Sequence, residues 1–160
     1  MTRIGIGYDS HRFAPGGPMR LGGITLPIDF QLVGHSDGDA IAHAVTDAVL
    51  GAAGAGDIGE MFSDTDEANL RRDSVEMLRL AVARVREAGW RVVNIDVTLI
   101  AERPVIGPYR RRMREALAPA LGVAPDAIGL KGKSNELMGW IGRGEGLACI
   151  AVASLDDADA

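Results

Sequence analysis

The sequence has few of the residues on which several large protein classes depend. Its single cysteine, Cys149, excludes a disulfide framework and lies in an apolar run, so we expect a buried, inert thiol rather than a nucleophile. No stretch approaches the roughly 18 to 20 apolar residues that cross a bilayer, and the N-terminus lacks the apolar core of a signal peptide. Aromatic residues make up only 4% of the chain and the net charge is -5, which argues against a nucleic-acid binder with a basic, stacking surface. We therefore expect a cytoplasmic protein that binds neither nucleic acid nor a membrane.

The length of 160 residues suits one domain with a substantial core. Apolar residues at helical spacing predict helices over 39–54 and 74–88, and a third from Pro108 through Leu121. Alternating or apolar runs predict a hairpin over 19–28 and strands over 3–8, 91–100, 128–131 and 146–155. Strands and helices alternate, so the predicted fold class is α/β or α+β, with one domain over 1–155 and a flexible acidic tail over 156–160.

Polar side chains near the start of the chain indicate a divalent-metal site. Asp9 and His11 are two residues apart in an extended segment, so both side chains leave the same face. His43 follows Asp39 by one turn on the predicted 39–54 helix, on a polar stripe that can face this strand. Two nitrogens and one carboxylate oxygen favour zinc with one open position, although other first-row metals suit the same donors. The alternative for each histidine alone is an ordinary core or surface residue.

The segment from His35 to Asp39 has the pattern of a helix cap, with Ser36 as the cap and Asp39 three residues later. Capping does not explain His35, which lies just outside, where the backbone donors of a helix N-terminus would face an anion. A role for His35 beside a phosphate and a purely structural role are both open at this point.

Two further segments are rich in polar groups. In the loop over 56–70, the segments 57–59 and 62–66 supply three carboxylates, those of Asp57, Asp64 and Asp66. Asn69 stands where a calcium loop needs glycine, which leaves solvated turn chemistry and hydroxyl binding as alternatives. Residues 131–136 combine two lysines with a hydroxyl, an amide and a carboxylate, a set that can hold a phosphate and a second cation. The arginines over 110–114 are expected to lie on a solvated helix face.

Together these segments resemble the 2-C-methyl-D-erythritol 2,4-cyclodiphosphate synthase family. The resemblance runs nearly end to end. Its carriers are Asp9-Ser10-His11, HSDGDAIAH from His35, GDIG from Gly56, FSDTD from Phe62, AERP from Ala101 and GRGEG from Gly142. The chain departs from the family's usual residues at Ser10, Ser63 and Val105, where valine, proline and lysine are common.

The resemblance implies a homotrimer whose subunits each have a mixed sheet backed by helices, with active sites between neighbouring subunits. It implies a cyclising phosphorus–oxygen lyase that converts 4-diphosphocytidyl-2-C-methyl-D-erythritol 2-phosphate into 2-C-methyl-D-erythritol 2,4-cyclodiphosphate and CMP, in non-mevalonate isoprenoid biosynthesis. It also implies one Zn²⁺ per subunit on Asp9, His11 and His43, and Mg²⁺ or Mn²⁺ near Glu136 at the substrate diphosphate.

By the same resemblance, His35 and Ser134 are expected to stabilise the transition state. Contacts to the methylerythritol side of the substrate are expected from Ser36, Asp57, Ile58, Gly59, Phe62, Ser63, Asp64, Thr65 and Asp66. Contacts to the cytidine phosphate are expected from a neighbour's Ala101, Glu102, Arg103, Pro104, Val105, Ile106, Gly107, Lys133 and Asn135. Trp140 and Arg143, with Glu145, are expected to line a central trimer channel, where an isoprenoid phosphate is a candidate ligand.

Two other functions stay open on the sequence. One is a zinc phosphoesterase, in which the open metal position activates water. The other is a noncatalytic trimer that binds a metal ion or an isoprenoid.

Overall fold

A five-stranded mixed sheet forms the framework of the computed structural model, which describes residues 1–159. Its strands, in spatial order, are β4 (Phe30–Leu32), β1 (Arg3–Pro15), β7 (Gly146–Asp157), β5 (Trp90–Ile100) and β6 (Ile128–Lys133). All neighbours are antiparallel except β5 and β6, which are parallel. A separate hairpin of β2 (Met19–Leu21) and β3 (Ile24–Leu26) confirms the one predicted over 19–28.

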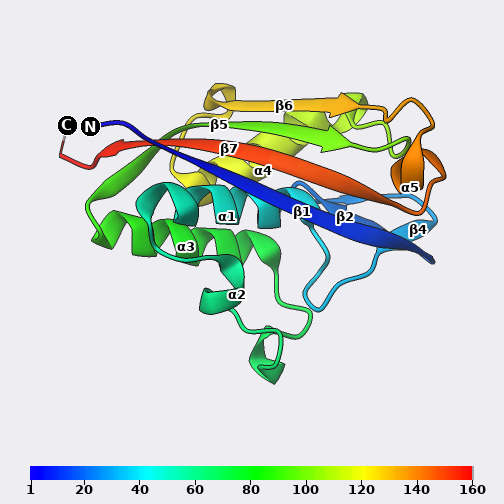
Figure 1. Ribbon diagram of the computed structural model, residues 1–160, viewed down its shortest axis with the longest axis horizontal. Helices are drawn as coiled ribbons and strands as arrows, with labels where there is room; N and C mark the ends of the chain where they lie inside the picture. The colour runs from blue at the N-terminus through cyan, green and yellow to red at the C-terminus, as the bar shows by residue number, and fades with distance from the viewer. Residues whose placement is uncertain (160) are drawn as a thin grey trace.

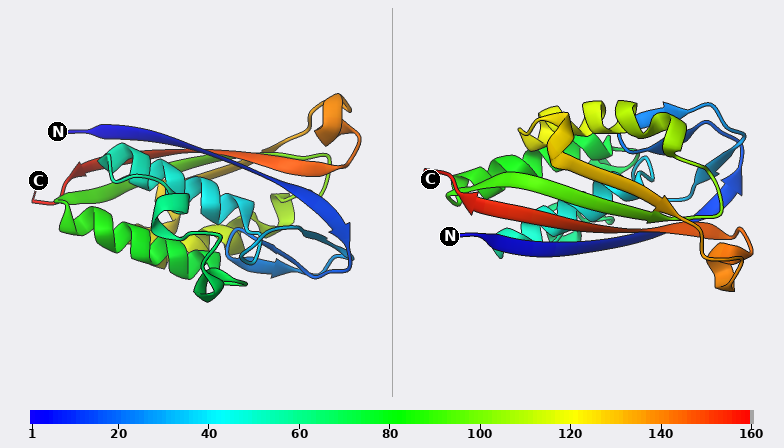
Figure 2. Two further views of the ribbon diagram at one scale, coloured as in Figure 1. Left: turned by 60° about the horizontal axis from the view of Figure 1, so that its bottom comes forward. Right: turned by 90° about the horizontal axis from the view of Figure 1, so that it is seen from above.

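Three long helices cover one face of this sheet: α1 (Ala40–Ala53), α3 (Ser74–Glu87) and α4 (Arg110–Leu121) (Figure 1). The shorter helical elements are α2 (Ile58–Met61), α5 (Gly139–Gly142) and 3-10 turns at Glu67–Asn69, Gly107–Tyr109 and Pro125–Ala127. Figure 2 shows the long strands from above, uncovered on the opposite face. The predicted mixed sheet backed by helices is confirmed. Over residues 1–159, none of the helices is both long enough and apolar enough to cross a bilayer.

Helix α1 lies very close to strand β1 because glycine occupies the facing positions of the strand. A Cβ atom added at Gly5 would stand 2.1 Å from the carbonyl oxygen of Ala48, and one at Gly7 would stand 1.9 Å from that of Ala44. No side chain larger than hydrogen fits between the two backbones. This contact brings the inward face of α1 against the part of β1 that contains the candidate metal ligands.

We expect Gly7→Ala to destabilise the protein by about 1–3 kcal/mol, because the added methyl group forces α1 away from β1. The matched control is Gly51→Ala on the same helix, where an added Cβ meets no atom within 4 Å. That control should stabilise the protein by about 0.5–1 kcal/mol, since glycine is the weaker helix former. Urea unfolding of both variants measures the difference. A Gly7→Ala protein as stable as the wild type would contradict this close contact.

The end of the chain differs from the prediction. Strand β7 continues through Asp156 and Asp157, which pair with β5, so these two residues belong to the sheet rather than to a flexible tail. The N-terminal ammonium of Met1 also bonds to both carboxylates, and Figure 1 shows β1 and β7 beside each other. Ala160, also placed in the tail, lies outside the described residues.

Candidate functional site

Three metal-ligating side chains converge where β1 meets α1. Asp9 and His11 come from the strand and His43 from the helix, and one ligand atom of each lies within 4.8 Å of the other two. Asp9 Oδ2 is 2.7 Å from His11 Nε2 and 3.2 Å from His43 Nδ1. The side chains expose between 12% and 25% of their surface. The predicted grouping of these three residues is confirmed.

Hydrogen bonds on the outer side of each imidazole orient its inner nitrogen. His11 Nδ1 lies 2.7 Å from the carbonyl oxygen of Val33, which only accepts, so this nitrogen donates its hydrogen. In a neutral ring, His11 Nε2 then presents a lone pair toward Asp9. His43 Nε2 likewise faces outward, 2.8 Å from Ser74 Oγ and 2.9 Å from Ser36 Oγ. Electron-donating atoms therefore meet at the centre of the cluster, an arrangement that suits a cation and fits the donor set of zinc.

The electrostatics of the metal-free cluster agree with this geometry. Burial alone would raise the pKa of Asp9, but its hydrogen bonds with His11 and His43 outweigh that effect and hold the pKa below its ordinary value. Burial alone would lower the pKa of His11, but the bond to Asp9 outweighs it and raises the pKa. When His11 is protonated, its Nε2 hydrogen lies between the two side chains, where a metal ion would otherwise bind.

We expect zinc affinity to fall as the pH drops through the raised pKa of His11, because the proton and the metal compete for Nε2. Because the hydrogen bond to Asp9 raises that pKa, the loss begins at a higher pH than for an unperturbed histidine. Below it, affinity should fall about tenfold per pH unit for each proton displaced. Competition with a chromophoric zinc chelator, from about pH 8 to pH 5.5, measures the dependence. An affinity constant over this range would contradict the assignment of Nε2 as a ligand.

A cavity of about 310 Å³ opens beside the metal ligands His11 and His43, and the loop over 56–70 forms part of its wall. Its lining residues are His11, His35, Ser36, His43, Ile58, Gly59, Phe62, Asp64, Asn69 and Met77. The structure therefore brings His35 and five of the predicted methylerythritol contacts together with the metal ligands.

The other predicted contacts of this loop take part in turns and caps. Asp57 caps α2 by accepting the Glu60 amide at 2.8 Å, and Asp66 accepts the Ala68 amide at 2.9 Å. The hydroxyl groups of Ser63 and Thr65 lie 2.7 Å apart and bond to each other. These four residues do not line the cavity. Their bonds fix the shape of the loop that carries Phe62 and Asp64.

Asp39, and not Ser36, caps helix α1, so the predicted cap is wrong. The fully buried carboxylate of Asp39 accepts the Ala42 amide at 3.0 Å and two amides of the β2–β3 hairpin at 2.7 and 2.8 Å. This carboxylate already fills the N-terminus of the helix. The helix end is therefore not an anion site beside His35, although His35 still lines the cavity. The hydroxyl of Ser36 faces His43 instead.

The predicted cytidine-phosphate contacts other than Arg103 and Asn135 line a second cavity, of about 260 Å³, at the ends of β5 and β6. Its lining residues are Leu99, Ala101, Glu102, Pro104, Val105, Ile106, Gly107, Arg110, Gly132, Lys133 and Ser134. Strands β7 and β5 separate β1 from β6 in the sheet, which places β1 and β6 about 14 Å apart. One chain therefore keeps the two cavities apart. Arg110 was expected on a solvated face, and its place in this lining was not predicted.

Glu102 holds the loop that follows β6. Its Oε1 atom accepts the amides of Asn135 and Leu137, both at 3.0 Å. Between them Glu136 adopts a left-handed backbone, with φ 53°, which is uncommon for a residue other than glycine. The Glu136 side chain accepts the hydroxyl of Ser134 at 3.1 Å and lies outside the cluster of three ligands. Glu102 was expected from the sequence as a substrate contact. Its hydrogen bonds to the loop that follows β6 were not predicted.

Arg103 also has a packing role. Its guanidinium lies 4.8 Å from the centre of the Phe30 ring, and Arg103 is not among the residues that line the second cavity. Arg103 instead lines another cavity of the chain, of about 300 Å³, together with Phe13, Asp29 and Phe30.

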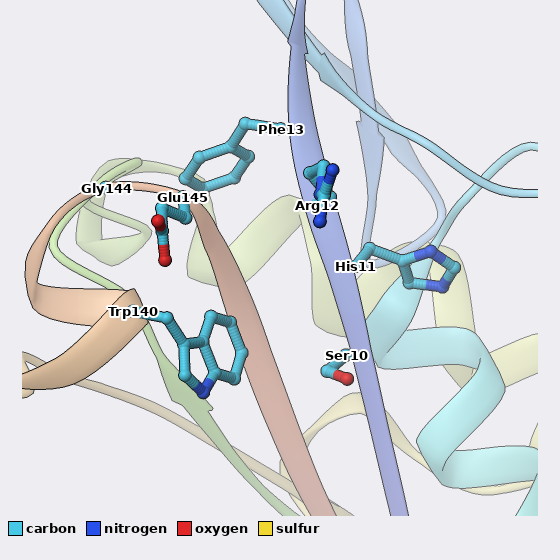
Figure 3. A pocket seen from close by; sticks show the side chains of 7 residues that line it. All are labelled: Ser10, His11, Arg12, Phe13, Trp140, Gly144 and Glu145. Atoms are coloured by element: carbon cyan, nitrogen blue, oxygen red, sulfur yellow. The ribbon is translucent and has the colours of Figure 1, made fainter.

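A cavity of about 580 Å³ lies on the opposite side of β1 from the ring of His11. Figure 3 shows Trp140 and Glu145 on one side of it and Ser10 and Arg12 of β1 on the other. The ring of His11 points away from this cavity, toward α1. Arg143 does not line it and pairs with Glu145 at 3.1 Å. Trp140 and Glu145 of the predicted channel thus lie together in this cavity, although the metal ligand His11 is also among its lining residues.

Cys149 takes no part in the chemistry. It pairs in register with Asp9 on the neighbouring strand and is fully buried. Burial raises the pKa of its thiol far above the ordinary value, so the thiol stays protonated. This confirms the buried, inert thiol expected from the sequence.

Comparison with known proteins gives concordant matches. Residues 2–156 match the model of the YgbB family. A curated 2-C-methyl-D-erythritol 2,4-cyclodiphosphate synthase from Gemmatimonas aurantiaca is 63% identical over 155 residues, which cover 97% of this chain and 93% of that relative.

Two solved structures show how closely the fold matches. The bifunctional IspDF from Campylobacter jejuni superposes with a TM-score of 0.94 at 37% identity, and the match covers all of this chain and 44% of that longer one. A CDP complex of IspF from Plasmodium falciparum superposes with a TM-score of 0.85 at 31% identity, covering 98% and 96% of the two chains.

Proposed function

Because the chain belongs to the YgbB family, in which its curated relatives are 2-C-methyl-D-erythritol 2,4-cyclodiphosphate synthases, we propose that it catalyses the same cyclisation. It converts 4-diphosphocytidyl-2-C-methyl-D-erythritol 2-phosphate into 2-C-methyl-D-erythritol 2,4-cyclodiphosphate and CMP, in non-mevalonate isoprenoid biosynthesis. The observation that carries the proposal is the convergence of Asp9, His11 and His43 beside a cavity lined by the motif residues.

The reaction needs orientation and charge neutralisation more than covalent catalysis. An oxygen of the 2-phosphate attacks the β-phosphorus, the bond from that phosphorus to the bridging oxygen breaks, and CMP leaves with that oxygen. Both reacting groups belong to one substrate, so correct positioning supplies much of the acceleration. No protein nucleophile is required, in keeping with the protonated thiol of Cys149.

Two cation sites fit the residues present. We assign zinc to Asp9, His11 and His43, since two imidazoles and a carboxylate leave one tetrahedral position free. Mg²⁺ or Mn²⁺ is assigned to Glu136, because magnesium sites combine one or two carboxylates with substrate phosphates. When bound, these cations neutralise phosphate charge and favour the transition state.

The remaining residues bind and orient the substrate. His35 and Ser36 offer donors to phosphate oxygens beside the metal ligands, and Phe62 offers apolar surface to the carbon skeleton. Lys133 and Ser134 line the second cavity and offer an ammonium and a hydroxyl group to the nucleotide phosphates. The hydrogen bonds within the 57–66 loop fix its shape, so that its polar side chains are held in place for the hydroxyl groups of the substrate.

A homotrimer would complete this site. On the bare face of the sheet, Ile4, Ile6 and Tyr8 of β1 expose 64%, 70% and 56% of their surface. Ile6 and Tyr8 pair with the half-buried Val152 and Ile150 of β7, so the apolar surface extends across two strands. Such a surface is typical of a protein interface. We infer that subunits pack through it, with the nucleotide cavity of one subunit beside the metal ligands of the next.

The cavity lined by Trp140 is the place we assign to an isoprenoid phosphate. The indole of Trp140 offers apolar surface, and Arg12 offers a cation for a phosphate. The highly charged substrate and product suit an enzyme of the cytoplasm.

Identification of the products tests this function against the alternatives. The zinc-loaded protein is incubated with the cytidine substrate and Mg²⁺, and the products are followed by ³¹P NMR. The proposal predicts CMP and the cyclic diphosphate in equal amounts. Release of inorganic phosphate would favour a zinc phosphoesterase instead, and bound metal without turnover would favour a noncatalytic binder.

A further inference from the structure

We propose that Ser74 and Asp37 are positioning residues that strengthen metal binding by fixing which ring nitrogen of His43 carries the hydrogen. The inference rests on the proposed metal site and extends it to two residues that do not contact the metal. We call this hydrogen-bonded set, from Asp37 through Ser74 to His43, the relay.

The relay is built from three separate segments. Ser74 is the fully buried first residue of α3, and its Oγ atom lies 2.8 Å from Nε2 of His43 on α1. On its other side, Ser74 Oγ makes a short hydrogen bond to Asp37 Oδ1, in the segment before α1. The second oxygen of Asp37 accepts the backbone amide of Ser74 at 3.0 Å. The hydroxyl of Ser74 is therefore held between a carboxylate and an imidazole.

The number of hydrogens decides the direction of each bond. An ionised carboxylate only accepts, so the single hydroxyl hydrogen of Ser74 goes to Asp37. The oxygen of Ser74 then has only lone pairs to offer His43 Nε2, which must supply the hydrogen. In a neutral ring this leaves the lone pair on Nδ1, the nitrogen that faces Asp9 at 3.2 Å. The relay thus selects the tautomer that can bind a metal ion together with Asp9.

Ser36 does not make this selection by itself. Its Oγ atom is 2.9 Å from His43 Nε2, but its other bond is a long one of 3.5 Å, accepted from the amide of Gly38. Within residues 1–159 no carboxylate accepts its hydrogen, so this hydroxyl can rotate either to donate or to accept. The carboxylate behind Ser74 makes the difference between the two serines.

Asp37 is itself fixed by further contacts. Its Oδ1 atom also accepts the amide of Asp39 at 3.1 Å, and its Oδ2 atom lies 3.7 Å from Nε of Arg20 on β2. A carboxylate held in this way polarises the hydroxyl in front of it and makes the inner nitrogen of the histidine a stronger ligand. By contrast, His11 depends on a backbone carbonyl, that of Val33. His43 is therefore the imidazole whose binding strength depends on other side chains.

Metal affinity in three variants tests the relay. We expect Ser74→Ala to raise the zinc Kd about 10- to 100-fold, the usual effect of losing a group that orients a metal-binding histidine. Ser74→Thr keeps the hydroxyl and should restore most of the affinity. The matched control is Asp73→Ala, since the neighbouring Asp73 caps α3 through the amides of Val75 and Glu76 and makes no bond to His43. It should lower thermal stability but leave the Kd unchanged.

A second measurement keeps the inference testable even if a variant fails to fold. The chain has only three histidines, so ¹⁵N-histidine NMR of the zinc-loaded wild type resolves each ring. We expect His43 to bear a hydrogen on Nε2 and to bind zinc through Nδ1. Zinc on Nε2 would overturn the inference.

The outcomes separate the inference from the proposed function. A wild-type protein that binds no zinc would refute the metal site itself. A wild type that binds zinc, with a Ser74→Ala variant that binds it equally tightly, would refute the relay alone. Loss of affinity in Ser36→Ala but not in Ser74→Ala would also refute it, because Ser36 would then be the partner of His43.

Discussion

His43→Ala is expected to lose bound zinc and to lower the rate of CMP release by roughly 10³-fold or more. The substitution leaves only Asp9 and His11, whereas catalytic zinc sites use three protein ligands. Without the cation, the charge on two reacting phosphates is no longer neutralised. Metal content after dialysis and the initial rate of CMP release, measured on the same sample, check both parts of the expectation.

Asp126→Asn is the matched control for this variant. Asp126 is an exposed carboxylate in a 3-10 turn, away from both substrate cavities. Its metal content and its rate should equal those of the wild type. Full zinc content and full CMP release in His43→Ala would show that the three converging side chains are not the metal site.

Two inactive variants are expected to restore activity to each other when their subunits are mixed. His43→Ala damages the metal side of a site, and Ser134→Ala combined with Lys133→Ala damages the nucleotide side. These two sides lie in separate cavities of one chain, at strands that two others separate. If each site forms between neighbouring subunits, random mixing gives about a quarter of the sites two intact sides.

The rate after mixing measures this arrangement. The two variants are unfolded together, refolded with zinc and assayed for CMP release, and each variant refolded alone is the control. Recovery of about a quarter of the wild-type rate supports intersubunit sites. If the mixture releases CMP no faster than each variant refolded alone, both sides of each site come from one subunit.

The features that were predictable from the sequence follow from regular periodicity. Alternation along β1 places Asp9 and His11 on one face whatever lies opposite, and helical spacing places His43 toward that face. Apolar residues at helical spacing likewise predicted α1 and α3 from the sequence alone. In each case the geometry of a single element decides the outcome, so no knowledge of tertiary contacts is needed.

The features that were missed depend on contacts between distant segments. Ser36 and Asp39 both suit a helix cap, and Asp39 becomes the cap because its buried carboxylate also accepts amides of the β2–β3 hairpin. The bond between Ser74 and His43 joins residues 31 positions apart, and no local pattern signals it. Strand β5 has a bulge between Val92 and Asn94, which shifts the register that simple alternation assigns.

The most direct test of the account is the fate of solvent oxygen during turnover. In the proposed cyclisation the attacking oxygen belongs to the substrate, so no water oxygen enters either product. Turnover in H₂¹⁸O followed by mass spectrometry should therefore give unlabelled CMP and unlabelled cyclic diphosphate. Incorporation of ¹⁸O into a phosphate product would mean that water is the nucleophile, and it would contradict the cyclisation.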